Sequence, residues 1–502
     1  MQTTTDIRRR STSAALDTQT QSRLGQYLTP DSIAGFMADM FDKPGQDVRL
    51  LEPGAGIGSL AKAFAARMEQ DGIKTLAASL YEIDPDMRAG LAVTLAEMTS
   101  NLQNSEMALE TEILSEDYIE ISTSSYQKEG FTHVIANPPY KKLGRNSDHA
   151  HQLSKLGYKT PNLYAAFLLL AARQLRPNGE MVAIVPRSFC NGPYFKAFRA
   201  DFFDMMDLRR VHVFESRKSA FSDDKVLQES IILHAIKREQ SGEVCISSSP
   251  NADFDVSSAD KAPIGTTLLH VNRDNVFLPG DAAMLVHLPL NTSDLDAVQT
   301  IRDFPSKLSE LDISISTGPV VDFRLRKHIH RDPTESSVPL IYAANLKNRQ
   351  LNWPISGKKP QHIEVNADTA KWLWPTGGYY VVTKRFSSKE EKKRIVATVT
   401  EAPEGQVLCG WENHLNVIHH DKRGLSEELA NGLAVFLNSS IVDRYFRVFN
   451  GHTQVNATDI RYLSFPSLGT LKDLGREFNV NTADQAAIDN RLNTLLSFEI
   501  AA

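Results

Sequence analysis

The chain has 502 residues, 41% of them hydrophobic and 23% charged, and a formal net charge of -6. Its length predicts two or three domains, and its acidic balance excludes a globally basic nucleic-acid binder, so any such contact must be a local patch. Three widely spaced cysteines, Cys190, Cys245 and Cys409, exclude a disulfide framework and a Cys/His zinc site, and they fit a reducing compartment with no metal centre.

The N-terminal stretch, residues 1–22, is polar and contains Arg8, Arg9 and Arg10. It lacks the apolar core of a signal peptide, so we expect a disordered tail. No later stretch approaches the length of a membrane span, and we expect a cytoplasmic protein with no membrane contact. An amphipathic helix is predicted over residues 32–41, and the segment GQYLTPD before it is by itself an ordinary helix start.

The first glycine-rich turn lies in residues 49–60, RLLEPGAGIGSL, which predict a strand, a tight turn and a helix to about Met68. This order opens a doubly wound α/β fold. The turn has neither the glycine spacing of a dinucleotide site nor the lysine of a P-loop. Glu52 before it would repel a pyrophosphate and attract a ligand with an ammonium and a sulfonium, such as S-adenosylmethionine. The alternative is that Glu52 only caps the loop or helix.

Two further acidic positions follow predicted strands. The apolar strand over residues 76–83 ends at Glu82, Ile83 and Asp84, which places a carboxylate at the carboxyl edge of the second strand. An adenosine ribose would meet it there. A third acidic site follows at Glu116-Asp117-Tyr118. These positions predict one ligand site built from the ends of several neighbouring strands.

The most informative stretch, Asn137-Pro138-Pro139-Tyr140, follows the apolar run 132–136, where a strand would deliver residues to an active site. Two prolines make the backbone stiff and leave it only carbonyl acceptors. An exocyclic amine such as adenine N6 is a poor nucleophile, because its lone pair is delocalised into the ring. The Asn137 amide oxygen and the Pro138 carbonyl would grip its hydrogens and localise that pair, while the Tyr140 ring stacks on the substrate. The alternative is a proline-rich turn that only closes the strand. From average composition, this four-residue string would occur by chance in roughly one such chain in a thousand.

The second half is predicted to be a separate domain. Residues 246–262 are polar and are predicted to be a linker between a catalytic domain, 23–245, and a strand-rich domain, 263–502. Residues 312–323 predict two strands around a turn. The densest basic cluster follows, with Arg324, Arg326, Lys327, His328, His330 and Arg331. Phosphate contact and a solvated charged face are equal alternatives for it.

A polar loop, HTQVNATD, follows two predicted helices that end near residue 449. His452, Gln454 and Asn456 in this loop are able to read base edges, and Gln and Asn suit adenine. A purely structural role is an equal alternative.

Taken in order, several of these segments resemble the amino-methyltransferases of bacterial restriction-modification systems. They are Gln26-Tyr27-Leu28-Thr29-Pro30, Glu52-Pro53-Gly54-Ala55-Gly56, Glu82-Ile83-Asp84, Asp117-Tyr118, Asn137-Pro138-Pro139-Tyr140 and Asn162-Leu163-Tyr164. The order is that of the gamma type, in which cofactor motifs precede target recognition. The resemblance covers residues 20 to 240, and the block 411–461 is similar to a segment of long adenine methylases of this class.

The resemblance implies a role for each matching position. The cofactor S-adenosylmethionine would be bound by Tyr27, Thr29, Glu52, Pro53, Gly54, Gly56, Glu82, Ile83, Asp117, Tyr118, Asn137 and Phe167. Within this set, Glu82 would bind the ribose hydroxyls, Asp117 would accept from the adenine amine, and Phe167 would pack on that ring. Asn137, Pro138, Pro139 and Tyr140 would be catalytic, with Tyr140 and Phe221 forming the base pocket. A core phenylalanine is an equal alternative for Phe221.

The resemblance also implies the fold and the reaction. We expect a Rossmann-like methyltransferase sheet followed by a mixed α+β target-recognition domain, in which Arg324, Arg326, Lys327, His452, Gln454 and Asn456 bind DNA. The protein would be a bacterial, DNA-associated monomer that methylates adenine N6 in double-stranded DNA, with a companion endonuclease encoded nearby. The alternatives are a protein glutamine or RNA amino-methyltransferase, a non-catalytic DNA specificity module, and a methyltransferase fused to a nuclease.

Overall fold

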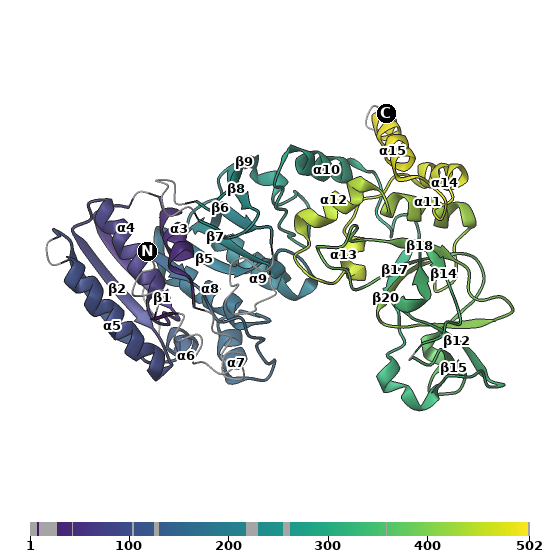
Figure 1. Ribbon diagram of the computed structural model, residues 1–502, viewed down its shortest axis with the longest axis horizontal. Helices are drawn as coiled ribbons and strands as arrows, with labels where there is room; N and C mark the ends of the chain where they lie inside the picture. The colour runs from purple at the N-terminus through teal and green to yellow at the C-terminus, as the bar shows by residue number, and fades with distance from the viewer. Residues whose placement is uncertain are drawn as a thin grey trace. The chain divides into compact units, whose positions relative to one another are not determined.

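The computed structural model describes residues 8–9, 28–42, 44–102, 105–124, 130–216, 229–254, 262–357 and 359–499. The chain forms two compact units, Met1–Leu290 and Asn291–Ala502, and Figure 1 labels many of their helices and strands. Apart from residues 8–9, the predicted disordered tail lies outside the described residues. No helix within the described ranges combines the length and apolar character needed to cross a bilayer.

The first unit is built on one nine-stranded sheet with the order β3-β2-β1-β4-β5-β7-β6-β8-β9. Its strands are β1 (Asp47–Pro53), β2 (Thr75–Tyr81), β3 (Ala108–Leu114), β4 (Phe131–Ala136), β5 (Leu175–Pro186), β6 (Asp207–Phe214), β7 (Ser230–Ile236), β8 (Glu243–Ser249) and β9 (Thr267–Asn272). The five strands β1 to β5 are parallel, and β7 is antiparallel to β5. Strands β2 and β3 are added on one side of β1, and β4 and β5 on the other, so the strand order switches between β1 and β4, which is where open α/β sheets bind ligands. The predicted doubly wound fold is confirmed.

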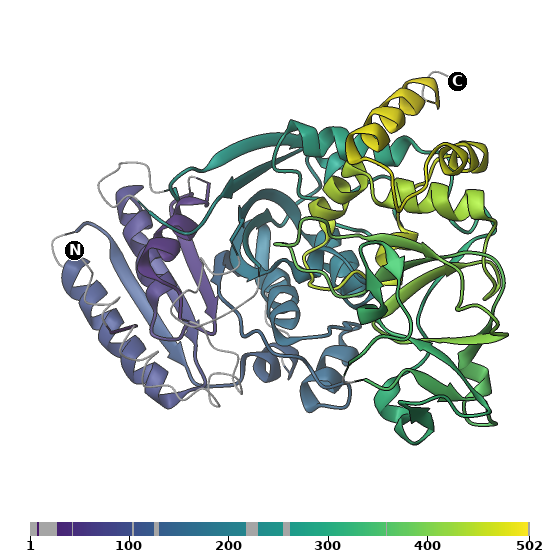
Figure 2. The same ribbon diagram turned by 45° about the vertical axis from the view of Figure 1, so that its right-hand side comes forward.

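Helices lie against this sheet (Figure 2). They are α3 (Asp31–Asp39), α4 (Ser59–Gln70), α5 (Pro85–Asn101), α6 (Tyr118–Ser124), α7 (Asp148–Lys155), α8 (Leu163–Gln174) and α9 (Lys196–Met205), with short 3-10 turns η2 (Arg187–Cys190), η3 (Pro193–Phe195) and η5 (Arg273–Asn275). Met37 of α3, Phe64 of α4 and Leu91 of α5 share one apolar core with Leu50 of β1. The strands β4 and β5 are buried along most of their length, because helices cover the sheet they cross.

The predicted linker at residues 246–262 is wrong in position. Residues 246–249 belong to β8, which pairs with β6 and β9 inside the sheet, and the first unit continues to Leu290. The serines that made this stretch look like a linker have partners there. Ser247 and Ser249 hydrogen-bond the imidazole of His212, and Ser248 hydrogen-bonds Glu215 and Thr267. Polar composition was therefore a poor guide, since paired hydroxyls are tolerated in a buried strand.

The second unit is mixed α+β, as predicted. One sheet has the order β10-β20-β17-β18, another β11-β15-β12-β19-β16, and β13 pairs with β14. The strands are β10 (Ser314–Thr317), β11 (Ile329–His330), β12 (Ser337–Ile341), β13 (Leu346–Lys347), β14 (Gln350–Leu351), β15 (His362–Glu364), β16 (Leu373–Pro375), β17 (Tyr380–Lys384), β18 (Ala397–Thr400), β19 (Leu408–Trp411) and β20 (Leu415–His419). The helical elements are α10 (Thr292–Asp303), η6 (Asp322–Arg324), η7 (Arg326–His328), η8 (Ala343–Asn345), η9 (Ala370–Trp372), α11 (Glu427–Leu437), α12 (Ser440–Phe449), α13 (Ala457–Arg461), α14 (Leu468–Glu477) and α15 (Gln485–Glu499).

The prediction of two strands over residues 312–323 is half wrong. The first strand is β10, but the second is replaced by a single parallel bridge between Val320 and Glu412 and then by η6. Pro319 has no N–H to donate to a ladder, so a second strand beginning there would lack a hydrogen bond.

Candidate active site

A cavity of about 240 Å³ opens at the carboxyl ends of the first four strands of the sheet. Gly54 and Gly56 follow β1, Glu82 follows β2, Asp117 follows β3 and Asn137 follows β4. The full lining is Leu28, Gly54, Gly56, Tyr81, Glu82, Ile83, Met87, Glu116, Asp117, Tyr118, Ile119, Asn137, Pro139, Lys141, His149, Leu163 and Phe167. Positions far apart in the sequence therefore meet at one edge, because parallel strands end there together.

The glycine-rich turn forms one wall through backbone conformations that other residues rarely adopt. Gly54 and Gly56 have φ angles of 78° and 55°. The N–H groups of Gly54 and Ala55 donate to the Tyr81 carbonyl at 2.9 and 2.7 Å, which ties the turn to the end of β2. A Cβ on Gly56 would lie 3.0 Å from the Leu28 side chain. Glycine here lets the backbone itself approach a ligand.

Glu52 lies directly before this turn, behind the cavity wall, and is 1% exposed. Burial raises the pKa of its carboxyl well above the ordinary value, although the Ala61 N–H hydrogen-bonds it. Its Oε2 has no hydrogen-bond partner among the described residues. A buried carboxylate with an unpaired oxygen is costly unless a cationic or hydrogen-bonding group meets it. The buried Oε2 of Glu52 therefore fits a site for a ligand that carries an ammonium group.

Glu82 connects the glycine turn to the second strand and is 3% exposed. Its Oε2 accepts from the Gly56 N–H and its Oε1 from the Asp84 N–H, both at 2.8 Å. Burial raises the pKa of Glu82, and these two hydrogen bonds offset part of that increase. Each carboxylate oxygen has a second lone pair, so a fixed Glu82 retains acceptor capacity for a ligand hydroxyl. Ile83 beside it is exposed and lines the cavity.

Three aromatic side chains, Tyr81, Tyr118 and Phe167, form part of the cavity lining. The Tyr118 ring packs 5.1 Å from Tyr81 and 5.0 Å from Phe167, centre to centre. Its hydroxyl donates to Gln174 at 3.1 Å, which holds the ring in place. Asp117 precedes Tyr118 and also lines the cavity. An aromatic wall beside one carboxylate suits a planar ring that carries an amino group.

Asp117 is held on both sides by groups of the protein. Its Oδ1 accepts from the N–H groups of Ile119 and Glu120 at 2.9 and 3.1 Å, at the start of α6. Its Oδ2 lies 3.2 Å from Nε2 of His149, a residue of α7. Burial raises the pKa of Asp117, but the hydrogen bonds from His149 and the helix backbone outweigh it, so the pKa lies below its ordinary value.

Asn137 stands where β4 enters the cavity. Its Nδ2 donates to the Thr29 hydroxyl at 3.0 Å, so the side-chain amide is fixed with its oxygen as the other, accepting end. Thr29 is buried, as is Pro138, and Pro139 lines the cavity. The Tyr140 hydroxyl donates to the Ile184 carbonyl at 3.1 Å, and its ring packs edge-on against Tyr164 at 6.2 Å. Hydrogen bonds thus hold the motif to the residues just before α3 and to β5.

The structure brings most of the predicted cofactor and catalytic residues to this one edge. Thr29, Glu52, Pro53, Pro138 and Tyr140 support the wall without lining it. Tyr27 and Phe221 lie outside the described residues. Sequence reasoning missed His149 and Lys141, which both line the cavity. Lys141 directly follows the motif and so carried a local signal, whereas nothing in the spacing of His149 pointed to Asp117.

The second unit holds the predicted DNA-binding residues, and several are occupied by internal contacts. Arg385 donates to Gln454 Oε1 and Asn456 Oδ1, both at 3.4 Å. Asn456 is also the N-cap of α13, where it forms a capping box with Asp459. The His452 carbonyl accepts from Arg394 at 2.6 Å. This loop is therefore held rigidly, and its amides are at least partly structural.

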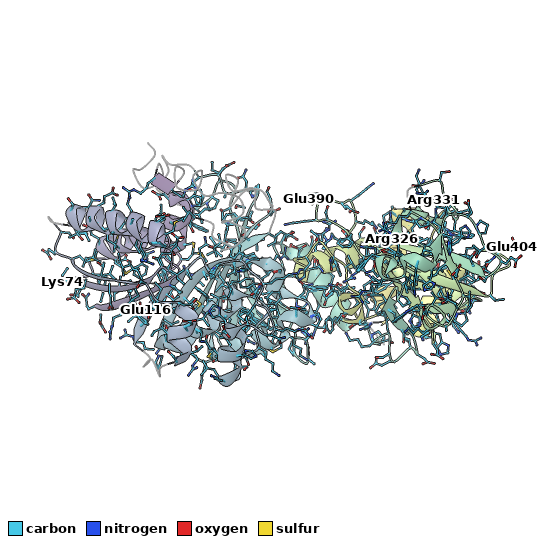
Figure 3. All side chains as sticks on the ribbon, turned by 90° about the horizontal axis from the view of Figure 1, so that it is seen from below. Lys74, Glu116, Arg326, Arg331, Glu390 and Glu404 are labelled. Carbon is cyan, nitrogen blue, oxygen red and sulfur yellow. The ribbon has the colours of Figure 1, made fainter. Side chains whose placement is uncertain are left out.

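The basic cluster is more open. Arg324 and Arg326 are exposed, and the Arg324 guanidinium lies 5.7 Å from the centre of the Phe323 ring. Lys327 pairs with Asp368 at 3.4 Å, with both side chains largely in solvent. Figure 3 labels Arg326 and Arg331, which belong to this cluster. Exposed guanidinium and ammonium groups of this kind remain available to phosphates.

Four distant segments of the second unit converge beside that cluster through backbone hydrogen bonds. Asn413 N–H donates to the Val320 carbonyl at 2.9 Å, Arg385 N–H to His414 at 2.8 Å, and Val455 N–H to Arg385 at 2.7 Å. Sequence reasoning missed the exposed aromatic groups that this arrangement brings close to the basic cluster. Phe386 is 49% exposed and its ring centre lies 5.2 Å from that of His414, while Phe323 is 72% exposed. We call Phe323, Arg324, Lys384, Phe386, His414 and Gln454 the aromatic-basic surface.

One cluster among the described residues has the composition of a metal site. Ligand atoms of Asp42, Glu180 and His234 lie within 4.8 Å of one another. Arg210 donates to Asp42 at 2.5 Å, and His234 hydrogen-bonds Glu180 at 2.8 Å. None of these residues lines the cavity. The charges are compensated inside the protein, so we interpret the cluster as an ion-pair network.

Comparison with known proteins gives consistent results. The family model of the Eco57I restriction-modification methylase matches residues 72–221. The type II methyltransferase M.BsuBI of Bacillus subtilis is 42% identical over 95% of this chain and 94% of its own length. The type II methyltransferase M.PstI of Providencia stuartii is 36% identical over 98% of this chain and 96% of its own. The solved structure of the type IIL restriction-modification enzyme MmeI in complex with DNA has a TM-score of 0.57 at 11% identity, covering 90% of this chain and 70% of that enzyme, which supports the fold alone.

Proposed function

Because this chain belongs to the type II methyltransferases of restriction-modification systems, we propose that it transfers a methyl group from S-adenosylmethionine to N6 of an adenine in a specific double-stranded DNA site. The methylation would protect host DNA from a companion endonuclease that cuts the same site. We expect the enzyme to act as a monomer on one strand.

The observation that carries this proposal is the fixed amide of Asn137. The Thr29 hydroxyl accepts from Asn137 Nδ2 at 3.0 Å and Asn137 lines the cavity, so its amide oxygen would be the end that accepts from a target amine. The next backbone acceptor is the carbonyl of Pro138, in a segment whose two prolines cannot donate. These two oxygen acceptors are adjacent in the sequence, and a pair of acceptors suits an NH₂ group. They would hold both hydrogens of the target amine and localise its lone pair, so that attack needs no prior deprotonation.

The cavity fits S-adenosylmethionine as the donor, which supplies an electrophilic methyl group on a sulfonium when bound. Glu52, with its unpaired buried oxygen, would face the positive methionine part together with the glycine turn. Glu82 would accept from the ribose hydroxyls and Asp117 from the adenine amine, with Phe167 packing on the adenine ring. Burial of Glu52 keeps its interaction with a cationic ligand largely unscreened.

The target base must leave the duplex before Asn137 can grip it, because a paired and stacked amine cannot be approached in line. Unstacking costs a few kcal/mol, and stacking on an aromatic ring returns roughly 1 to 3 kcal/mol. Tyr140, fixed through its hydroxyl to β5, would supply that ring. The two energies are comparable, so phosphate contacts must supply the remainder. The aromatic-basic surface and the cluster around Arg326 support such contacts in the second unit.

Cytosine N4 is also an exocyclic amine and is the nearest competing target. The resemblance of the block 411–461 to long adenine methylases favours adenine. Purified protein would be incubated with isotopically labelled S-adenosylmethionine and plasmid DNA, ribosomal RNA or a ribosomal release factor. We expect label in DNA alone, and nucleoside mass spectrometry should identify N6-methyladenine. Label in N4-methylcytosine would correct the base, while label only in RNA or protein, or none at all, would refute the proposal.

A further inference from the structure

His149 is the cavity-lining side chain whose position the motifs do not explain. It lies in α7, which begins at Asp148 and has Leu153 as its buried residue. Its Nε2 is 3.2 Å from Asp117 Oδ2, and both residues line the same cavity. Both side chains are partly exposed, 27% for His149 and 24% for Asp117, so a ligand in the cavity would meet the pair directly.

His149 lies in a segment, residues 142–162, whose two ends are joined by backbone hydrogen bonds. Leu143 N–H donates to the Pro161 carbonyl at 3.0 Å, and Leu163 N–H donates to the Lys141 carbonyl at 2.8 Å. The chain therefore leaves the catalytic motif, forms α7 and returns to α8 at nearly the same point. The His149–Asp117 pair connects this segment to the loop after β3, which lies about 30 residues earlier in the sequence.

His149 supplies the third hydrogen-bond donor to the Asp117 carboxylate. The other carboxylate oxygen already accepts two N–H groups of α6, so His149 fixes the remaining rotational freedom of the carboxylate. A carboxylate held by three donors keeps one orientation, and its remaining lone pairs point in a defined direction. Without the imidazole, only the two backbone N–H groups that donate to Oδ1 would restrain the rotation of the carboxylate.

We propose that His149 is a positioning residue of the methyl-donor pocket, which orients Asp117 to accept from the exocyclic amine of the donor's purine ring. This inference rests on the proposed use of S-adenosylmethionine. Asp117 touches the ligand and His149 acts through it. The pairing also raises the pKa of His149, against the effect of burial, which favours the protonated, charge-assisted form of the contact.

The first test measures binding of S-adenosylhomocysteine to the full chain by calorimetry. His149→Ala should weaken binding on the order of tenfold, the size of one charge-assisted hydrogen bond. His149→Gln keeps an N–H donor and should recover most of that loss. The matched control is His151→Ala, since His151 is exposed on the same helix, and it should bind as the wild type does.

The second test separates positioning from general damage to the pocket. The probe is the analogue of S-adenosylhomocysteine that carries hydrogen in place of the 6-amino group. The wild type should prefer the amino compound, and His149→Ala should lose most of that preference. Equal weakening of both compounds, or no weakening of either, would overturn the inference. If the wild type binds neither compound, the proposed donor itself is wrong, which is a distinguishable failure.

Charged neighbours give a third readout. Asp117 and Glu120 from the α6 region and Asp148 on α7 face the imidazole and favour its protonated form. A raised pKa means that the ion pair is complete at low pH and weakens as pH rises through the folded pKa. Donor affinity of the wild type should therefore fall several-fold between about pH 6 and pH 9, and this dependence should be flat in His149→Gln. The same slope in both proteins would contradict the role.

Discussion

The cavity of the first unit and the aromatic-basic surface of the second place their functional groups in opposite environments. Glu52 and Glu82 are buried, and backbone N–H groups hydrogen-bond both carboxylates. Phe323 and Phe386 of the aromatic-basic surface stand in solvent, and Lys327 of the basic cluster that follows Phe323 in the sequence has an exposed partner. Buried charges interact strongly and at fixed geometry, whereas exposed ones are screened by salt. Under the proposed function, methyl transfer and donor binding would therefore depend on single fixed atoms, and DNA binding on the sum of many weak contacts.

Asn137→Ala should affect the cavity more than any other substitution proposed for it. Loss of the fixed amide oxygen should lower kcat by at least about 10²-fold, because an acceptor aimed at the reacting group is removed. Donor affinity should change little, as measured by calorimetry beside a methyl-transfer assay. Asn146→Ala, in the exposed loop that follows, is the control and should be fully active. An active Asn137→Ala enzyme would remove the chemical role from the cavity.

Glu52→Gln should act on donor binding and on stability with opposite signs. Donor affinity should fall about 30-fold or more, since a buried charge partner is lost. The donor-free protein should gain stability at neutral pH, because a buried carboxylate with an unpaired oxygen no longer has to be desolvated. Exposed Glu69 on α4 offers the control Glu69→Gln, which should change neither quantity.

The pH dependence of that gain follows from the raised pKa of Glu52. Between the unfolded and the folded pKa the folded state binds the extra proton, so Glu52 makes the protein less stable as pH rises. Chemical denaturation of the donor-free protein should show the advantage of Glu52→Gln growing from about pH 4.5 upward. An advantage that shrinks with rising pH would mean that Glu52 is paired after all.

On the second unit, Phe386→Ala should weaken binding to target-site DNA by about tenfold, the contribution of one stacked aromatic group. Donor affinity should not change. The control is Val407→Ala, because Val407 is 77% exposed in the same unit but lies outside the aromatic-basic surface. Fluorescence anisotropy with a labelled duplex would compare them. If both variants bind DNA equally well, this surface is not where DNA is contacted.

The smallest expected effect is that of Lys327→Ala. Its ion pair with Asp368 is exposed and weak, so the lysine is available to a phosphate. DNA affinity should drop about threefold for target and non-target duplexes alike, and the salt dependence of log K should decrease by about one. Lys74→Ala, a similarly exposed lysine before β2 in the first unit, is the control. A loss confined to the target sequence would assign base reading to Lys327.

The sequence predicted the parallel part of the first sheet well. Strands predicted near residues 49, 76 and 132 appear as β1, β2 and β4, since long apolar runs bounded by glycine or proline have few alternatives. Prediction was poorer where pairing replaced local signals. The serines of β8 resembled a linker, and the stretch after Pro319 resembled a strand, because the hydrogen bonds that decide both cases come from remote residues.

The chain by itself determined the local chemistry of the site: positive φ at Gly54 and Gly56, and a stiff, donor-free segment at Pro138-Pro139. Tertiary structure alone decided what those groups face. Thr29 meets Asn137 across 108 positions, His149 meets Asp117, and the aromatic-basic surface joins segments near residues 320, 385, 413 and 454. Backbone conformation follows from a residue and its neighbours, but the partner of a side chain depends on how strands order in a sheet, which no short stretch of sequence encodes.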